Sequence, residues 1–219
     1  MAAVALAALV ALTGCRPDPT TGAPPPLSAE VRPFRAPVSR VSPAELGASW
    51  RPGCPVHHSR LRRVSIPYWN YAGYRRVGQL IVNVHVVQDV RDAFRHLYER
   101  RFQVRSIRPV SEFRGASDDR SMAANNTSAF NCRYVAGTTT WSQHSYGRAV
   151  DVNPVQNPYV RNGVADPPSG QPWIARTPAG PGMAVPRNVL VRAFKDQGWG
   201  WGGDWSSARD YQHFSQNGR

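Results

Sequence analysis

The feature that most constrains the fold is a pair of short motifs that place histidines near aspartates, in a chain of 219 residues with six histidines. The first motif spans residues 142–151 and the second spans residues 210–214. Gly147, between His144 and Asp151, can adopt a positive φ angle, so the chain can fold back there. We therefore expect the first motif to bring the imidazole of His144 beside the carboxylate of Asp151.

The residues after this turn predict a short strand that presents Asp151. Residues 148–153 alternate as strands do, with Asp151 on one face. His213 arrives on a second extended segment and would complete a set of three ligands. Two histidines and one carboxylate form a common ligand set for Zn²⁺, and three protein ligands leave a fourth position for water. We therefore predict a catalytic zinc site made of His144, Asp151 and His213.

A further carboxylate lies near the third ligand. Asp210, three residues before His213, is the candidate for the base that takes a proton from water at the metal. Asp204 is a competitor for this role, but its spacing from His213 is looser. The second motif therefore predicts Asp210 as a catalytic residue.

The two motifs together resemble those of the M15 zinc peptidases of peptidoglycan. These include D-alanyl-D-alanine carboxypeptidases of the VanY and VanX kind and L-alanyl-D-glutamate endopeptidases. The residues that carry the resemblance are Ser142, His144, Gly147, Ala149, Asp151, Asp210 and His213. The resemblance extends over roughly residues 50–215. Residues 126–133, 153–159 and 201–205 are similar to a subgroup typical of secreted actinobacterial proteins.

The resemblance implies a fold and an activity. The fold is α+β, with a small antiparallel sheet that carries the zinc site, flanked by helices and long loops, as in M15 and hedgehog-like domains. The activity is hydrolysis of a peptide bond in peptidoglycan stem peptides. D-Ala-D-Ala carboxypeptidase activity is the leading expectation, because an arginine near the metal suits a free carboxylate. An L-Ala-D-Glu endopeptidase and a catalytically silent zinc-binding envelope module are the alternatives.

The family also implies substrate-binding residues. Its members place an arginine near the zinc, where it holds the substrate carboxylate or the developing oxyanion. We predict Arg133 for this role and place Arg120 second, and a plain surface position is the alternative for either. Ser142 and Trp205 are further candidates for substrate binding.

The N-terminus resembles an export signal. Residues 2–12 form an apolar run that is too short to span a bilayer but matches the core of a secretory signal. Residues 12–15 resemble the lipobox of bacterial lipoproteins, in which Cys15 is acylated and holds the protein at the membrane surface. No Lys or Arg precedes the apolar run, which departs from that pattern, and an ordinary cleaved signal is the alternative. We expect a cell-membrane lipoprotein or a protein of the cell-wall space.

These features divide the chain into three parts. Residues 1–15 are the predicted signal peptide, 16–45 a Pro-rich linker, and 46–219 the zinc peptidase domain. The prolines of the linker disfavour helices and central strands, so we expect a semi-extended tether. Cys54 and Cys132 remain once Cys15 is assigned to lipid, and two cysteines in an exported protein are expected to pair. A thiolate ligand to zinc is the alternative.

The positive charge of the chain indicates which kinds of partner it can attract. The formal net charge is +13, and it comes almost wholly from arginine because Lys195 is the only lysine. Such a charge favours anionic partners such as wall polymers or lipid headgroups, although codon bias would explain it equally well. The arginines are scattered and form no nucleic-acid motif, so we expect no nucleic-acid partner. We expect a monomer whose partner is the peptidoglycan peptide.

Local patterns predict the elements that frame the site. Residues 80–87 are rich in β-branched side chains and predict a strand with His85 in its middle. Asp89 is then a candidate N-cap for a helix that runs to about Arg101. The apolar face of this helix would consist of Val90, Phe94, Leu97 and Tyr98.

The remaining segments predict one more strand, one more helix and long loops. Residues 102–110 are a strand candidate, and the polar stretch 112–131 predicts a loop over the site. The Pro- and Gly-rich residues 154–185 are too long for a simple connection and suggest a flap that faces substrate. A helix is expected from Pro186, closed by Gly198, followed by an aromatic turn.

Overall fold

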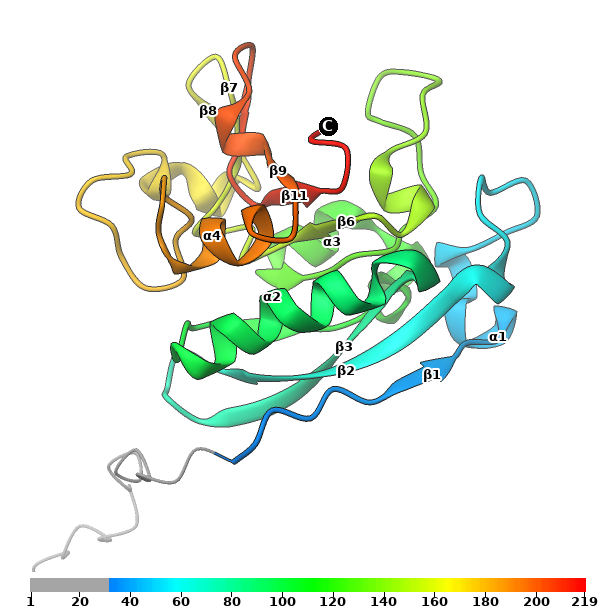
Figure 1. Ribbon diagram of the computed structural model, residues 1–219. Coiled ribbons are helices and arrows are strands. Elements are labelled where there is room, and N and C mark those ends of the chain that lie inside the picture. The colour runs from blue at the N-terminus through cyan, green and yellow to red at the C-terminus, as the bar shows by residue number, and fades with distance from the viewer. Residues whose placement is uncertain (1–31) are drawn as a thin grey trace, which may run out of the picture.

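The computed structural model describes residues 32–219 (Figure 1). The predicted signal peptide, Cys15 and the first half of the predicted linker lie outside these residues. The α-helices in the described part are α1 (Pro43–Leu46), α2 (Val87–Glu99), α3 (Asp118–Ala123) and α4 (Val189–Lys195). The strands of the larger sheet are β1 (Val38–Arg40), β2 (Leu61–Trp69) and β3 (Arg75–Asn83). The short strands are β4 (Ser106–Ile107), β5 (Asn126–Thr127), β6 (Ala149–Asp151), β7 (Tyr159–Arg161), β8 (Val164–Asp166), β9 (Gly200–Trp201), β10 (Arg209–Asp210) and β11 (His213–Ser215).

The larger sheet forms the base of the molecule. Its order is β1-β2-β3, and both pairings are antiparallel. Helix α2 follows β3 and packs across this sheet (Figure 1). Val64 and Leu80 are direct cross-strand partners that are fully buried, so the face of the sheet toward α2 is apolar. This burial is the main reason that the sheet and the helix form one unit.

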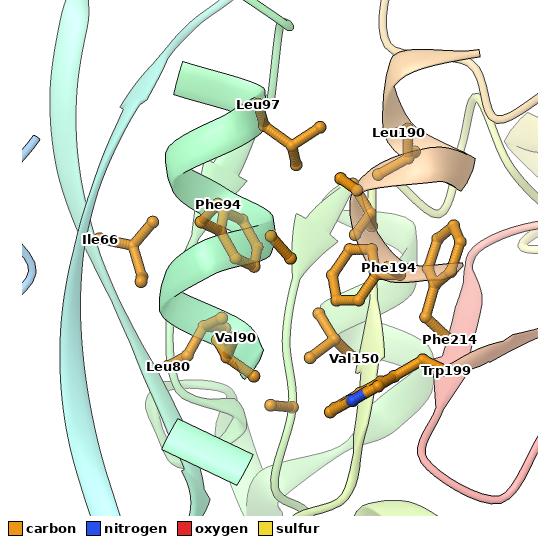
Figure 2. Packing of buried hydrophobic residues seen from close by; sticks show 14 of the residues in the cluster. Ile66, Leu80, Val90, Phe94, Leu97, Val150, Leu190, Phe194, Trp199 and Phe214 are labelled. Carbon is orange, nitrogen blue, oxygen red and sulfur yellow. The ribbon is translucent and has the colours of Figure 1, made fainter. Parts of the chain in front are cut away.

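A continuous hydrophobic core joins the larger sheet to the segment that carries the two motifs. Figure 2 shows α2 between the sheet residues Ile66 and Leu80 on one side and the side chains of α4 on the other. The ring of Phe94 meets that of Phe194 edge-on at 6.0 Å, and Phe194 stacks on Phe214 at 4.5 Å. Because Phe214 directly follows His213, the core holds the second motif in place.

Three small sheets complete the fold. Strands β6, β11 and β9 form an antiparallel sheet with β11 in the centre, and β10, β7 and β8 form another. Strands β4 and β5 form a short parallel pair. The small β6-β11-β9 sheet contains Asp151 and His213, so the predicted α+β class with an antiparallel sheet at the site is confirmed.

The strand predicted at residues 80–87 is wrong at its C-terminal end. Strand β3 ends at Asn83, whose side-chain oxygen accepts the backbone N–H of His85 at 3.2 Å. This cap starts a 3₁₀ turn that leads directly into α2, so His85 lies in a turn and not in a strand. Asp89 is within the first turn of α2 instead of at its N-cap, and it accepts the indole N–H of Trp199 at 3.1 Å. The predicted apolar face of the helix is buried as expected.

Other predicted boundaries are also corrected. Strand β2 was not predicted, and only the short strand β4 forms within residues 102–110. The predicted loop 112–131 contains α3, which Ser117 caps by accepting the backbone N–H of Arg120. The helix expected from Pro186 begins at Val189, because Arg187 has φ of 65° and interrupts the helical conformation.

The described half of the predicted linker belongs to the folded body. Strand β1 pairs with β2, and Ser42 and Glu45 form a capping box at α1. Pro43 occupies the first turn of that helix, where its missing N–H costs nothing. Pro37 directly precedes the edge strand β1 and Pro43 opens α1, and both positions tolerate proline. Within residues 32–219, no helix is long and apolar enough to cross a membrane.

Candidate metal centre

The register of two strands brings two of the three predicted ligands, Asp151 and His213, together. In the antiparallel pair of β6 and β11, Asp151 and His213 are direct partners. The Nδ1 atom of His213 lies 3.0 Å from Oδ1 of Asp151, and both side chains are only 7% exposed. Two residues that are far apart in the sequence are thus buried side by side on neighbouring strands of one sheet.

His144 reaches the same position from a 3₁₀ turn at residues 143–146. Gly147 ends this turn with φ of 64°, as the sequence predicted. A Cβ atom at Gly147 would lie 2.7 Å from the backbone nitrogen of Asn83, so a larger residue would push the turn away from β3. The backbone N–H of Asn83 donates to the carbonyl of Gly147 at 2.9 Å and holds the turn against the sheet.

The three ligand atoms lie at distances that suit a metal ion. The Nε2 atom of His144 is 3.1 Å from Oδ2 of Asp151 and 3.2 Å from Nδ1 of His213. For zinc–nitrogen distances of about 2.0–2.1 Å, the edge of a coordination tetrahedron is about 3.3 Å. The two imidazole nitrogens are 3.2 Å apart, which is close to that edge, and each lies 3.0–3.1 Å from a different oxygen of Asp151. These residues could therefore hold a metal ion.

Hydrogen bonds on the far sides of the two imidazoles fix their orientation. Nδ1 of His144 donates to the carbonyl of Ala129, and Nε2 of His213 donates to the carbonyl of Arg219 at 3.2 Å. Each ring therefore turns its other nitrogen toward Asp151, where a neutral imidazole can offer its lone pair to a metal ion. Such outer hydrogen bonds are typical of metal-binding histidines, because they set the tautomer and raise the basicity of the ligand. Neither carbonyl was predicted, since backbone acceptors leave no signal in a sequence.

The electrostatics of the cluster favour an ionised Asp151. Burial acts to raise the pKa of Asp151, but the neighbouring imidazoles of His144 and His213 outweigh it and hold the pKa well below its ordinary value. Burial acts to lower the pKa of His213, but the hydrogen bond and charge of Asp151 reverse this and raise it. The cluster is thus a buried anion flanked by two imidazoles, which is the charge pattern that a divalent cation complements.

Asp210 lies on β10, within electrostatic reach of the ligand cluster. Burial raises the pKa of Asp210 from 3.8 to about 7, and the nearby charge of His213 acts in the opposite direction. Its Oδ1 atom is buried and lacks a hydrogen-bond partner among residues 32–219. Gly202 makes room for it, because a Cβ atom there would lie 2.8 Å from Cβ of Asp210. The competitor Asp204 is 53% exposed and pairs with Lys195 at 2.6 Å, away from this environment.

Arg133 is tied to the turn that carries His144. Its backbone N–H donates to the hydroxyl of Ser145 at 2.8 Å, and that hydroxyl donates to the carbonyl of Arg133 at 2.6 Å. Its guanidinium forms an ion pair with Asp118 at 2.6 Å. The positive charge of Arg133 also lowers the pKa of Asp210, after the larger effects of burial and the ligand cluster. The guanidinium therefore acts on the same site as the predicted base.

The other substrate-binding candidates have different surroundings. Arg120 lies on the exposed side of α3. Ser142 is buried, and its hydroxyl caps the 3₁₀ turn by accepting the backbone N–H of His144 at 3.3 Å, which is a structural role. The ring of Trp205 lies 5.5 Å from that of His213, and its indole N–H donates to the carbonyl of Gly218. Of the three, Trp205 is placed beside a predicted ligand.

The predicted disulfide is present. Cys54 and Cys132 are bonded, with their Cα atoms 5.9 Å apart, so neither thiol is a metal ligand. The bond fixes residues 51–54 against the segment that leads into Arg133. Arg51 reinforces this contact by donating to the carbonyl of Cys132 at 2.8 Å.

The long insertion between the motifs is folded and contributes to the site. Its strand β7 pairs with β10, and Tyr159 is the direct partner of Asp210. Arg176 organises the insertion by donating to four oxygens, those of Gln156, Trp173, Asn157 and Ala184. Its guanidinium lies 4.4 Å from the ring centre of Tyr211. The insertion therefore supports the strand that carries Asp210, a contribution that the sequence did not reveal.

Two histidines and one aspartate thus converge beside the half-buried carboxyl of Asp210 in an α+β fold, an arrangement that suits a metal-dependent hydrolase. Residues 136–216 match the family model described as D-alanyl-D-alanine carboxypeptidase, of the M15 peptidases, and this range contains both motifs. The match supports the M15 peptidase family predicted from the sequence, over the part of the chain that contains both motifs. Searches among curated proteins and among solved structures gave no match.

The family sets the activity at a general level. It supports a peptidase that acts on peptidoglycan, and M15 peptidases depend on a metal ion. A location outside the cytoplasm, such as the cell wall, follows from that substrate, and the disulfide fits an oxidising compartment. The actinobacterial subgroup stays a prediction.

Proposed function

We propose that this protein is a zinc-dependent peptidase that hydrolyses peptide bonds of peptidoglycan stem peptides, with D-Ala-D-Ala carboxypeptidase activity as the leading candidate. The observation that carries the proposal is the convergence of His144, Asp151 and His213. One ligand atom from each lies within 4.8 Å of the others, the two imidazole nitrogens are 3.2 Å apart, and outer hydrogen bonds turn both imidazoles inward. Zinc is the metal that most often takes this ligand set and leaves one position open.

Asp210 has the properties of a general base in such a site. When bound, the metal supplies Lewis-acid polarisation of water and of the scissile carbonyl. Oδ1 of Asp210 accepts a proton from the attacking water and returns it to the nitrogen of the leaving amine. This Oδ1 atom is buried and has no hydrogen-bond partner among the described residues, so it is free to exchange a proton with water at the metal.

Arg133 is the proposed group that binds negative charge on the substrate. Its backbone is fixed next to His144 through Ser145, and its guanidinium holds Asp118. A terminal carboxylate of a stem peptide can share this guanidinium with Asp118, which would hold it in position, because arginine offers several N–H groups to carboxylates. This feature favours a carboxypeptidase over an L-Ala-D-Glu endopeptidase, whose scissile bond is internal.

The test uses purified protein with defined muropeptides, and mass spectrometry identifies the products. Zinc-loaded protein should release terminal D-alanine, chelator should stop the release, and added zinc should restore it. Asp210→Asn should be inactive. Asp204→Asn is the matched control and should keep full activity, because Asp204 is exposed and bound to Lys195.

The products also decide between the alternatives. Cleavage between L-alanine and D-glutamate would assign endopeptidase activity instead. If the zinc-loaded protein releases neither product, or if Asp210→Asn is as active as the wild type, the proposal of an enzyme is wrong. A silent zinc-binding module would then remain.

The remaining parts of the proposal concern the setting of the domain. We propose that Cys15 carries lipid. The lipid would hold a monomeric domain on the outer face of the cell membrane, within reach of peptidoglycan. Metabolic labelling with a fatty acid would test this, since Cys15→Ser should lose the label.

A further inference from the structure

A cavity lies at one end of the larger sheet, and none of the residues of the metal centre lines it. Its volume is about 360 Å³, and its lining consists of Arg40, Val41, His58, Ser59 and Arg62. Two of these five residues are arginines and none is acidic. The cavity is therefore a positively charged surface feature that the peptidase activity does not explain.

The two arginines of this cavity face each other across two strands. Arg40 on β1 and Arg62 on β2 are direct partners in the antiparallel register, so their side chains lie on the same face of the sheet. Like charges placed directly opposite each other destabilise a strand pair. The nearby carboxylate of Glu45 does not relieve this repulsion, because it is bound to Arg63 at 2.7 Å. Arg63 adjoins Arg62 in the strand and so points to the opposite face.

Hydrogen-bond donors in the cavity are held ready for an acceptor. Nη1 of Arg62 donates to the carbonyls of Ser59 and Leu61, both at 2.8 Å, which fixes this guanidinium and leaves its other N–H groups available. Nδ1 of His58 is buried and has no hydrogen-bond partner in the described part of the chain. Together these groups offer several donors to an anion, and the lining contains no carboxylate to compete for them.

We propose that this cavity is a binding site for a phosphate group. A phosphate offers three or four acceptor oxygens, which can serve both guanidiniums and His58 at once, whereas a carboxylate has only two oxygens. Arginine pairs bind phosphate through charge-assisted hydrogen bonds. The bound anion would also remove the repulsion between Arg40 and Arg62. Envelope phosphates occur both as soluble esters and as lipid headgroups, and the cavity chemistry is common to the two.

The first experiment measures binding of inorganic phosphate by ³¹P NMR titration at constant ionic strength. Arg40→Gln should raise the dissociation constant about tenfold, the loss expected for one charge-assisted contact. Arg35→Gln removes the same charge from an exposed position outside the cavity and should leave the constant unchanged. A parallel thermal melt provides a second readout, because Arg40→Gln should be at least as stable as the wild type without phosphate but should gain less stability when phosphate is added.

The outcomes decide the proposal. If the wild type does not bind phosphate, or if the Arg40→Gln and Arg35→Gln variants bind it equally well, there is no such site. Sedimentation with vesicles then identifies the source of the phosphate. Binding to phosphatidylglycerol vesicles, and not to phosphatidylcholine vesicles, that is lost in Arg40→Gln assigns the site to a lipid headgroup. Phosphate binding without vesicle binding assigns it to a soluble ester.

Discussion

Replacing Asp210 by asparagine should stabilise the metal-free protein while it abolishes activity. Burial raises the pKa of Asp210 from 3.8 to about 7, so the folded state binds a proton that the unfolded state releases between these two values. Each pKa unit corresponds to about 1.36 kcal/mol, so ionised Asp210 costs the metal-free fold up to about 4 kcal/mol above pH 7. Asparagine has nearly the same shape and carries no charge. It therefore avoids this cost.

The sign of the effect defines the assay. Because the pKa of Asp210 is raised in the folded state, the contribution of its neutral form to the unfolding free energy is fully present below pH 3.8. This contribution is lost as the pH rises to about 7. The difference in unfolding free energy between Asp210→Asn and wild type should therefore be small near pH 4, grow up to pH 7 and then level off. Urea unfolding in the presence of a chelator, at three pH values, measures this difference.

Two results would contradict this reasoning. One is an asparagine variant whose advantage does not change between pH 4.5 and pH 8. The other is a variant that is less stable than the wild type at pH 8, since that would mean that ionised Asp210 is well solvated or paired. Asp204→Asn is the control, because this carboxylate is exposed and should show no such pH dependence.

Three further changes probe separate parts of the site. Asp151→Asn should weaken zinc binding more than about 100-fold, because it removes the only anionic ligand of the cluster. A competition assay with a chromogenic chelator measures this, and an unchanged affinity would exclude the cluster as the metal site. Asp118→Asn should lower kcat/KM about tenfold for substrates with a free terminal carboxylate but not for their amides, because it removes the ion pair that positions Arg133. Equal losses on both substrates would indicate a general structural effect. Replacing Cys54 and Cys132 by serine should lower the unfolding free energy measured in urea by about 2–4 kcal/mol, and reduction of the wild type should lower it equally. An unchanged midpoint of the urea transition would show that the bond does not constrain the unfolded chain.

The convergence of His144 and Asp151 was predictable because a local pattern of side chains carries it. Gly147 marks the turn, and the alternation after it orients Asp151, so one half of the site follows from neighbouring residues. The pairing of β6 with β11 is a long-range contact that the pattern alone does not specify. It was not predicted; the convergence of His213 was inferred from residue types, and the family resemblance then supported it. Without that resemblance the convergence of His213 would have rested on residue types alone.

The parts that were missed depend on backbone groups and on tertiary packing. The carbonyls of Ala129 and Arg219 orient the imidazoles, and any residue type offers a carbonyl. The role of Arg176 is also hidden, because a Pro- and Gly-rich stretch gives no sign that one guanidinium will bind four of its oxygens. Asp118 was not recognised as the partner of Arg133, since the helix that presents it lies in a segment that reads as a polar loop.

Errors at element boundaries share one physical origin. Asn83 and Arg187 each interrupt an otherwise continuous pattern through local backbone conformation, one by capping a turn and the other by a positive φ angle. Side-chain hydrophobicity is the same on both sides of such a point. The pattern therefore predicts that an element exists better than it predicts where the element ends.

The same cluster predicts how metal binding depends on pH. Without metal, the hydrogen bond and charge of Asp151 outweigh burial and raise the pKa of His213, so the site holds a proton where the ligands would otherwise hold a cation. A metal ion must displace that proton, so its affinity should rise with pH, by up to about tenfold per pH unit, until His213 is neutral in the metal-free protein. Zinc affinities measured by chelator competition at pH 6, 7 and 8 test this, after correction for protonation of the chelator. An affinity that is the same at all three values would mean that His213 carries no proton in the metal-free site, and that the short contact with Asp151 does not depend on one.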